Sequence, residues 1–233
     1  AVVTGRRRIG KTALLLHAFG DAPMLYFFVA RQAERELCET FRAEIENKLG
    51  EPVGGAFASF ADVFDYVMRL AEKRPLVLVI DEFQDFLRVA PHVYSRMQAV
   101  WDLRHGRAKI ALVVCGSVHS LMNRLFRDRK EPLYGRQTDF LDLRPFGTGT
   151  LRSILGTLRP RFRPEDLLAF WSLTGGVAKY VSLLADDGAL SKEKMVDAVL
   201  SPSSPFVGEG RAALVEEFGK DYGTYFSVLS CIA

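Results

Sequence analysis

The chain begins with residues 1–12, which read AVVTGRRRIGKT. A short apolar run is followed by Gly5, four intervening residues and then Gly10-Lys11-Thr12, after which Leu14, Leu15 and Leu16 continue a helical pattern. A buried strand, a glycine-bearing loop and the first turn of a helix, in that order, form a P-loop. Such a loop points backbone N–H groups and the positive end of a helix dipole at phosphate oxygens. The opening residues therefore predict a nucleoside triphosphate site.

Several residue types in the loop have a predicted role at the phosphates. Lys11 is expected to reach the β and γ phosphates, and the hydroxyl of Thr12 is expected to bind Mg²⁺, so the predicted ligand is ATP with Mg²⁺. The three arginines are expected to form a solvated positive collar, with nucleic-acid contact as the lesser alternative. The predicted nucleotide-binding set in the loop is Gly5, Arg6, Arg7, Arg8, Ile9, Gly10, Lys11, Thr12 and Ala13.

Strands and helices alternate along the first 145 residues. Apolar runs predict strands at 1–4, 24–30, 76–80, 110–114 and 140–143. Amphipathic segments predict helices at 11–19, 33–49, 59–72 and 95–103, with Ser59 as the N-cap of the third. The run at 76–80 is apolar throughout, which is typical of a parallel strand buried on both faces. The predicted fold class is α/β, with a mostly parallel five-stranded sheet flanked by helices.

The character of the sequence changes after Pro145. No further strong strand pattern follows, and short helices are expected around Leu151, Leu167, Tyr180, Met195 and Leu214. We therefore predict a P-loop core over residues 1–145 and a helical lid domain over 146–205. Residues 206–233 are predicted to be connecting helices and the incomplete start of a further domain.

Composition excludes several classes of protein. Of 233 residues, 48% are hydrophobic and 25% charged, which is an ordinary globular balance rather than a disordered or membrane-like one. The apolar runs, 76–80 among them, are far shorter than the roughly 20 residues that span a bilayer, and no signal peptide is visible. The three cysteines match no metal or redox spacing, so we expect reduced thiols in a cytoplasmic protein. The net charge of +3 permits a nucleic-acid partner without requiring one.

A pair of carboxylates follows the strand predicted at 76–80. In a P-loop protein an aspartate at this place holds Mg²⁺, which predicts that role for Asp81. The adjacent Glu82 can orient and deprotonate the attacking water, so it is the predicted catalytic base. The alternative is that Glu82 only caps the following segment.

Two further residues are candidates for sensing the γ-phosphate. Ser117 follows the strand predicted at 110–114, and ligands of open α/β sheets bind where strands end. Its alternative role is the N-cap of the next helix. Arg136 could act as a finger or switch arginine, in its own subunit or a neighbour's, although a surface salt bridge is the default for a single arginine.

Five sequence elements occur together in order and resemble one family. They are the P-loop, residues 80–84 (IDEFQ), residues 116–117, residues 133–136 (LYGR) and residues 174–180 (TGGVAKY). Together they resemble the archaeal-type ATPase family, which belongs with the STAND and AAA+-like P-loop ATPases that carry a catalytic glutamate.

The resemblance implies features that the residues alone do not. It implies a sheet in which the P-loop strand neighbours both the fourth strand and the Asp81–Glu82 strand. It also implies a helical lid in which Gly175 and Gly176 lie near the adenine, although Ala178 stands where the family usually has proline. The final residues resemble the opening helix of a winged-helix domain, which a nuclease-like domain often follows in similar proteins.

Three functions are compatible with these observations. The leading one is a slow ATPase that uses its nucleotide state as a conformational switch, with ATP and ADP as partners and self-association as an option. The second is a DNA-directed ATPase that engages duplex through the winged helix. The third is a nucleotide-binding scaffold with negligible turnover, against which the intact Asp81–Glu82 pair argues.

Overall fold

The structure, a computed structural model, describes residues 1–232 except 21, 51, 207–208, 210–214 and 216–220. The chain divides into two compact units, Ala1–Arg144 and Pro145–Ala233. The helix predicted around Leu214 lies outside the described residues. No helix within the described part of the chain is both long and apolar enough to cross a bilayer.

The first unit is built on a five-stranded sheet in the order β2-β3-β4-β1-β5. All four strand pairings are parallel, which confirms the predicted fold class. The strands are β1 (Val2–Thr4), β2 (Met24–Phe28), β3 (Leu76–Asp81), β4 (Ile110–Gly116) and β5 (Phe140–Asp142). Every residue of β3 is buried, as its continuous apolar sequence predicts.

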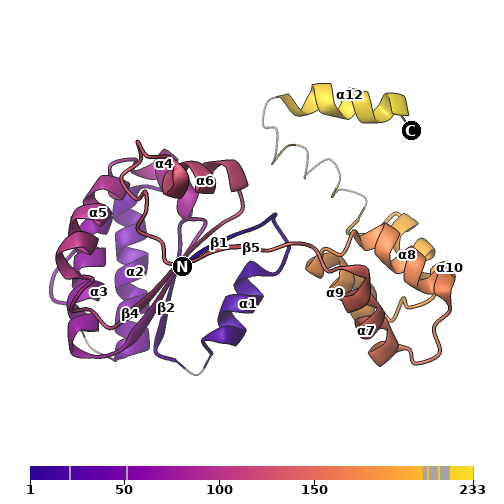
Figure 1. Cartoon of the computed structure of the whole chain (residues 1–233), viewed down its shortest axis with the longest axis horizontal. Coiled ribbons are helices and arrows are strands. Elements are labelled where there is room, and N and C mark those ends of the chain that lie inside the picture. The colour runs from indigo at the N-terminus through magenta and orange to yellow at the C-terminus, as the bar shows by residue number, and fades with distance from the viewer. Residues whose placement is uncertain (21, 51, 207–208, 210–214, 216–220, 233) are drawn as a thin grey trace. The chain divides into compact units, whose positions relative to one another are not determined.

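Helices cover both faces of this sheet. Helices α2, α3 and α5 lie on one face and α1 lies on the other (Figure 1). The helical segments of this unit are α1 (Lys11–Ala18), α2 (Glu34–Leu49), α3 (Phe60–Lys73), the 3₁₀ turn η1 (Phe83–Asp85), α4 (Phe86–Val89), α5 (Val93–Arg104) and α6 (His119–Arg127). The start of α3 is capped as expected, because Asp62 accepts hydrogen bonds from the backbone N–H and the hydroxyl of Ser59, at 2.9 and 2.8 Å.

The alternation of side chains along β3 determines which residues face the P-loop. Leu78 and Ile80 pack into the larger core beneath α2 and α3, whereas Val77 and Val79 pack against Leu15 of α1. Because successive side chains of a strand point to opposite faces, Asp81 continues the α1 side of the sheet.

The strand order corrects one expectation. The P-loop strand was expected to neighbour the Asp81–Glu82 strand, but β4 lies between them and pairs with both: Val114 is the register partner of Val2 in β1 and of Ile80 in β3. The end of β4 is therefore placed between the P-loop and Glu82.

The second unit is helical in the residues described. Its helices are α7 (Thr148–Leu158), α8 (Pro164–Thr174), α9 (Ala178–Asp186), α10 (Lys192–Leu200) and α12 (Tyr222–Ile232). Helices α7–α10 share a separate core around Leu151, Leu155 and Phe170. A buried carboxylate fixes this bundle: Asp166 accepts hydrogen bonds from the backbone N–H groups of Arg163 and Lys192, at 2.8 and 2.9 Å.

Candidate nucleotide-binding site

The P-loop runs from the end of β1 to the start of α1, as predicted. Gly10 has φ 97° and Arg8 has φ 67°, so the loop uses left-handed backbone at two places. Gly5 has no room for a side chain, because an added Cβ would lie 2.8 Å from the carbonyl oxygen of Leu143. The loop therefore needs glycine at Gly5 for space and at Gly10 for conformation.

Lys11 is folded into this loop. Its side chain is 6% exposed, and its ammonium donates to the carbonyl oxygens of Gly5, at 2.9 Å, and Arg6, at 3.2 Å. Burial lowers the pKa of Lys11, and the nearby carboxylates of Glu82 and Asp81 oppose that effect. A cation held at the centre of the loop is in the place where phosphate charge would be bound.

Asp81 connects β3 to the P-loop. Its Oδ2 accepts hydrogen bonds from the hydroxyl of Thr12, at 3.1 Å, and from the hydroxyl of Tyr26. Its Oδ1 accepts from the backbone N–H of Glu82, at 2.8 Å, and from the thiol of Cys115, at 3.0 Å. These four donors come from α1, β2, the turn after β3 and β4, so the carboxylate is held by several elements of the first unit.

Glu82 begins the turn after β3 and faces the end of β4. Its backbone has φ 52° and ψ 40°, a conformation that costs a non-glycine residue about 1–3 kcal/mol and persists where the surroundings enforce it. The carboxylate oxygen Oε2 accepts from the hydroxyl of Ser117, at 2.7 Å, and from the amide of Gln84, at 2.6 Å. Glu82 is the N-cap residue of the 3₁₀ turn, as the capping alternative predicted, but its side chain makes no cap hydrogen bond to the turn.

Ser117 also departs from one of its two predicted roles. Helix α6 has Val118 at its N-cap and no side-chain cap bond, so the N-cap reading of Ser117 is wrong. The reason is that α6 begins at His119, so the extended residue Val118 separates Ser117 from the helix. The structure thus brings Lys11, Thr12, Asp81, Glu82 and Ser117 to the strand ends nearest the P-loop.

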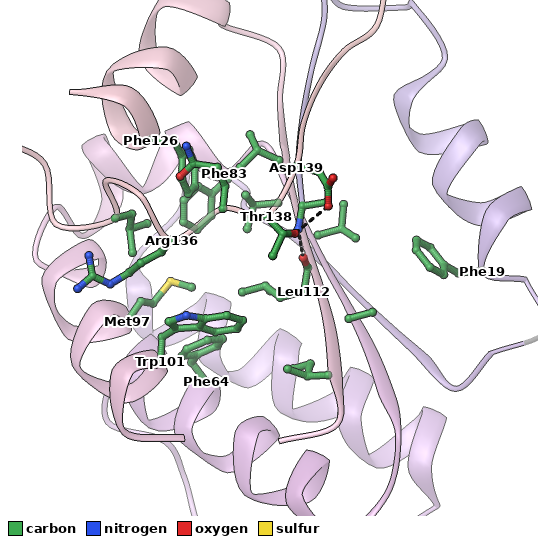
Figure 2. Close-up of a pocket in the computed structure, with 18 residues that line it drawn as sticks. Phe19, Phe64, Phe83, Met97, Trp101, Leu112, Phe126, Arg136, Thr138 and Asp139 are labelled. Carbon is green, nitrogen blue, oxygen red and sulfur yellow. Dashed lines mark hydrogen bonds between the residues drawn. The ribbon is translucent and has the colours of Figure 1, made fainter. Parts of the chain in front are cut away.

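Arg136 is not brought to this cluster. Its guanidinium forms a two-pronged ion pair with Asp102, at 2.9 and 2.7 Å, and donates to the carbonyl oxygens of Pro132 and Tyr134. It lines an apolar cavity of about 310 Å³, on the side where Met97 and Trp101 lie (Figure 2). The structure therefore shows Arg136 in an ion pair, which is the contact expected by default for a single arginine.

The two glycines that were predicted to lie near the adenine, Gly175 and Gly176, have structural roles in the second unit. Gly175 ends α8 in the left-handed conformation, with φ 55°. Gly176 has φ 72°, and an added Cβ would lie 2.2 Å from the carbonyl oxygen of Phe146. Its carbonyl accepts from the Phe146 N–H at 2.8 Å, so the pair joins the start of this unit to the α8–α9 turn.

Sequence reasoning missed three residues of the site. Tyr26 was predicted only as part of an apolar strand, and Cys115 was assigned to the core. Gln84 was noted only as the last residue of the sequence IDEFQ at 80–84. The one signal in the sequence was the Tyr26 hydroxyl inside an otherwise apolar strand. A buried tyrosine normally has a hydrogen-bond partner, so this hydroxyl indicated a polar group nearby. Burial raises the pKa of both the Tyr26 phenol and the Cys115 thiol, so each stays protonated and able to donate.

The donor set around Thr12 and Asp81 fits Mg²⁺. The described residues contain no group of three or more His, Cys, Asp or Glu side chains that could cage a metal. Mg²⁺ seldom uses such a cage; it binds through one or two protein oxygens and completes its shell with phosphate oxygens and water. The Thr12 hydroxyl and the Asp81 carboxylate, 3.1 Å apart, supply oxygen ligands of that kind.

Comparison with solved structures agrees with this fold. A Walker-type ATPase of Pyrococcus abyssi superposes with a TM-score of 0.65 at 17% identity, covering 99% of this chain and 70% of that one. The ORC2 protein of Aeropyrum pernix, solved as ADPNP and ADP complexes, has a TM-score of 0.58 at 20% identity, covering 91% of this chain and 64% of that one. A STAND protein of Pyrococcus horikoshii with a tetratricopeptide repeat sensor has a TM-score of 0.50 at 17% identity, covering 79% and 27%.

Comparison of sequences identifies the family. An uncharacterized protein of Methanocaldococcus jannaschii is 25% identical over 180 residues, which are 77% of this chain and 38% of that protein. This chain therefore spans well under half the length of that relative. The model of a family described as an ATPase domain found predominantly in Archaea matches residues 1–184. With its P-loop on a parallel sheet and a carboxylate pair two strands away, the chain belongs to this archaeal ATPase family.

Proposed function

We propose that this chain binds ATP with Mg²⁺ at the P-loop, hydrolyses it slowly and uses its nucleotide state as a conformational switch. The observation that carries the proposal is the 3.1 Å contact between the Thr12 hydroxyl and Asp81, beside Glu82. It supports a shared site for the phosphates, the metal and the water-activating base, on the ends of β1 and β3.

The roles of the residues follow from this arrangement. The loop N–H groups and Lys11 bind the phosphates, and Thr12 and Asp81 hold Mg²⁺, which when bound neutralises charge on the β and γ oxygens. Glu82 takes the proton of the attacking water. Slow turnover is supported by the position of Arg136, which pairs with Asp102 instead of joining this cluster.

The switch is supported by the single proton of Ser117. A serine hydroxyl donates one hydrogen bond, and here it goes to Glu82. A γ-phosphate oxygen within reach of Ser117 competes for that proton and thereby changes what holds Glu82. We propose that residues 146–205 serve as the lid that responds, with Gly175 and Gly176 near the adenine, and that Arg136 can leave Asp102 to act at a γ-phosphate in this subunit or a neighbour's.

The DNA-directed alternative has one argument of its own. An ORC1 protein of Aeropyrum pernix, solved in complex with DNA, has a similar fold, with a TM-score of 0.52 at 15% identity, covering 94% of this chain and 66% of that one. If DNA directs this chain as well, duplex should raise its turnover, and that stimulation should fall steeply with salt.

A phosphate-release assay with and without duplex DNA tests these proposals. We expect Lys11→Ala to abolish nucleotide binding and Glu82→Gln to retain binding while lowering kcat by about 10²–10⁴-fold, the usual contribution of a general base. Glu36→Gln makes the same chemical change at an exposed position of α2 and should leave the rate unchanged. Undiminished ATP consumption by Glu82→Gln would refute the assigned base, and absent turnover by wild type with and without DNA would favour the scaffold.

A further inference from the structure

We propose that Gln84 is a positioning residue for Glu82, holding one carboxylate oxygen so that the other faces the attacking water. This inference rests on the proposed function, because it assigns Gln84 a role through the base named there. Its starting point is the 2.6 Å hydrogen bond from Gln84 Nε2 to Glu82 Oε2.

The two donors to Glu82 bind the same oxygen. Ser117 Oγ and Gln84 Nε2 both reach Oε2, from the end of β4 and from η1. The carboxylate therefore keeps Oε1 as its acceptor for the proton of a water. This is the general logic of an activated base, in which a third group fixes the orientation of the base while the base acts on the reactant.

Gln84 is rigid enough for that task. Its side chain is 2% exposed, and it sits between Phe83 and Asp85 in a turn anchored on both sides. The backbone N–H of Asp85 donates to the carbonyl of Glu82 at 2.8 Å, and the hydroxyl of Tyr94 donates to the carbonyl of Phe83 at 3.0 Å. Ser117 differs in this respect, because its hydroxyl can rotate toward a phosphate whereas the amide of Gln84 is enclosed.

A purely structural role leaves one feature of Gln84 unexplained. Its Oε1 is buried without a hydrogen-bond partner, and it fills the space over Gly116, where an added Cβ would lie 2.2 Å away. Burying a polar atom in this way is unfavourable, and an apolar side chain of the same length would avoid the cost. The amide orientation follows from Glu82, since turning Oε1 toward a carboxylate oxygen would bring two acceptors together. We therefore assign the buried amide N–H of Gln84 to the hydrogen bond with Glu82, and not to packing of the core.

The test is a double-mutant cycle between Gln84→Met and Glu82→Gln, measured by single-turnover hydrolysis and by nucleotide affinity. Methionine keeps the length and volume of the side chain and removes the donor. We expect Gln84→Met to lower the hydrolysis rate by about 10- to 100-fold with unchanged ATP affinity, because hydrogen bonds to charged groups are among the stronger ones. In the Glu82→Gln background the same change should have little further effect, since the group it positions is gone.

Gln137→Met is the matched control. Gln137 also has a buried Oε1 without a partner, but it lies in the wall of the cavity that Arg136 lines. This variant should keep the wild-type hydrolysis rate, and thermal melts of each variant verify that it is folded.

Each outcome separates the two proposals. If Glu82→Gln keeps full activity, the assignment of the base fails, and the role of Gln84 fails with it. If Glu82→Gln is inactive while Gln84→Met keeps the wild-type rate, only the role of Gln84 fails. If Gln84→Met lowers the rate equally in both backgrounds, or lowers ATP affinity, its effect is structural and the proposal is overturned.

Discussion

Replacing Gly116 by alanine is expected to slow hydrolysis by displacing Gln84 rather than by touching the nucleotide. The new Cβ would lie 2.2 Å from Gln84 Oε1, 2.6 Å from Met122 Sδ and 2.8 Å from Met122 Cγ. Ordinary van der Waals contact begins at 3.4 Å, so the Gln84 oxygen would have to move by about 1.2 Å. The φ of Gly116 lies outside the left-handed region, so this crowding, and not backbone strain, is the perturbation.

The magnitude follows from the same geometry. Overpacking of a buried site costs about 1–3 kcal/mol of stability. We expect the amide to move as one group, and an equal shift of Nε2 away from Glu82 would stretch the 2.6 Å bond to about 3.8 Å, beyond hydrogen-bond range. The hydrolysis rate should then fall by about tenfold or more.

The assay is single-turnover ATP hydrolysis at a temperature where thermal melts show the Gly116→Ala variant to be fully folded. Gly106→Ala is the matched control: an added Cβ there meets nothing within 4 Å, so its rate and stability should match wild type. A folded Gly116→Ala variant that hydrolyses ATP at the wild-type rate would refute the link from Gly116 through Gln84 to Glu82.

Two further predictions concern the second unit. Asp166→Ala should lower stability by about 1–3 kcal/mol for each of the two backbone N–H groups that lose their acceptor, measured by denaturant unfolding. Burial raises the pKa of Asp166, but those two N–H groups and the guanidinium of Arg159 outweigh it, so the pKa lies below its usual value. Because the folded-state pKa is lowered, the ionised carboxylate stabilises the folded state at pH values above the unfolded-state pKa of about 3.9. The difference in free energy of unfolding between wild type and Asp166→Ala should therefore shrink as the pH falls below that value. A difference that stays constant with pH would contradict the assignment. Gly176→Ala should destabilise this unit, because its Cβ would lie 2.2 Å from the Phe146 carbonyl oxygen and its φ is 72°. Gly149→Ala is the control: its Cβ meets nothing within 4 Å and it lies in α7, where alanine has the higher helix propensity, so this variant should lose no stability in the same unfolding measurement.

Local patterns predicted the parts of this protein that local physics controls. The apolar run at 76–80 predicted β3 because a strand covered on both faces needs an apolar side chain at nearly every position. Ser59 predicted the start of α3 because a cap acts within three residues. The P-loop was visible because its glycines, its lysine and its threonine are contiguous.

Contacts between strands were outside the reach of such patterns. The sequence allowed Ser117 either to cap a helix or to contact a phosphate. In the structure its hydroxyl donates a hydrogen bond to Glu82, which is 35 positions away in the sequence. Arg136 had no fixed partner until the fold placed Asp102 beside it. Tyr26 and Cys115 became donors to Asp81 because β2 and β4 flank β3, and strand order depends on long-range pairing.

By itself, then, the sequence determined the strand–loop–helix of the P-loop, the parallel α/β class and the identity of the carboxylate pair. These depend on residue type and on spacing along a few neighbouring positions. Only the tertiary structure decided that β4 separates β1 from β3, and that Gln84, with a buried and unpartnered amide oxygen, holds Glu82. The order of strands and the enclosure of a side chain are set by how the whole sheet packs, and no local pattern encodes that.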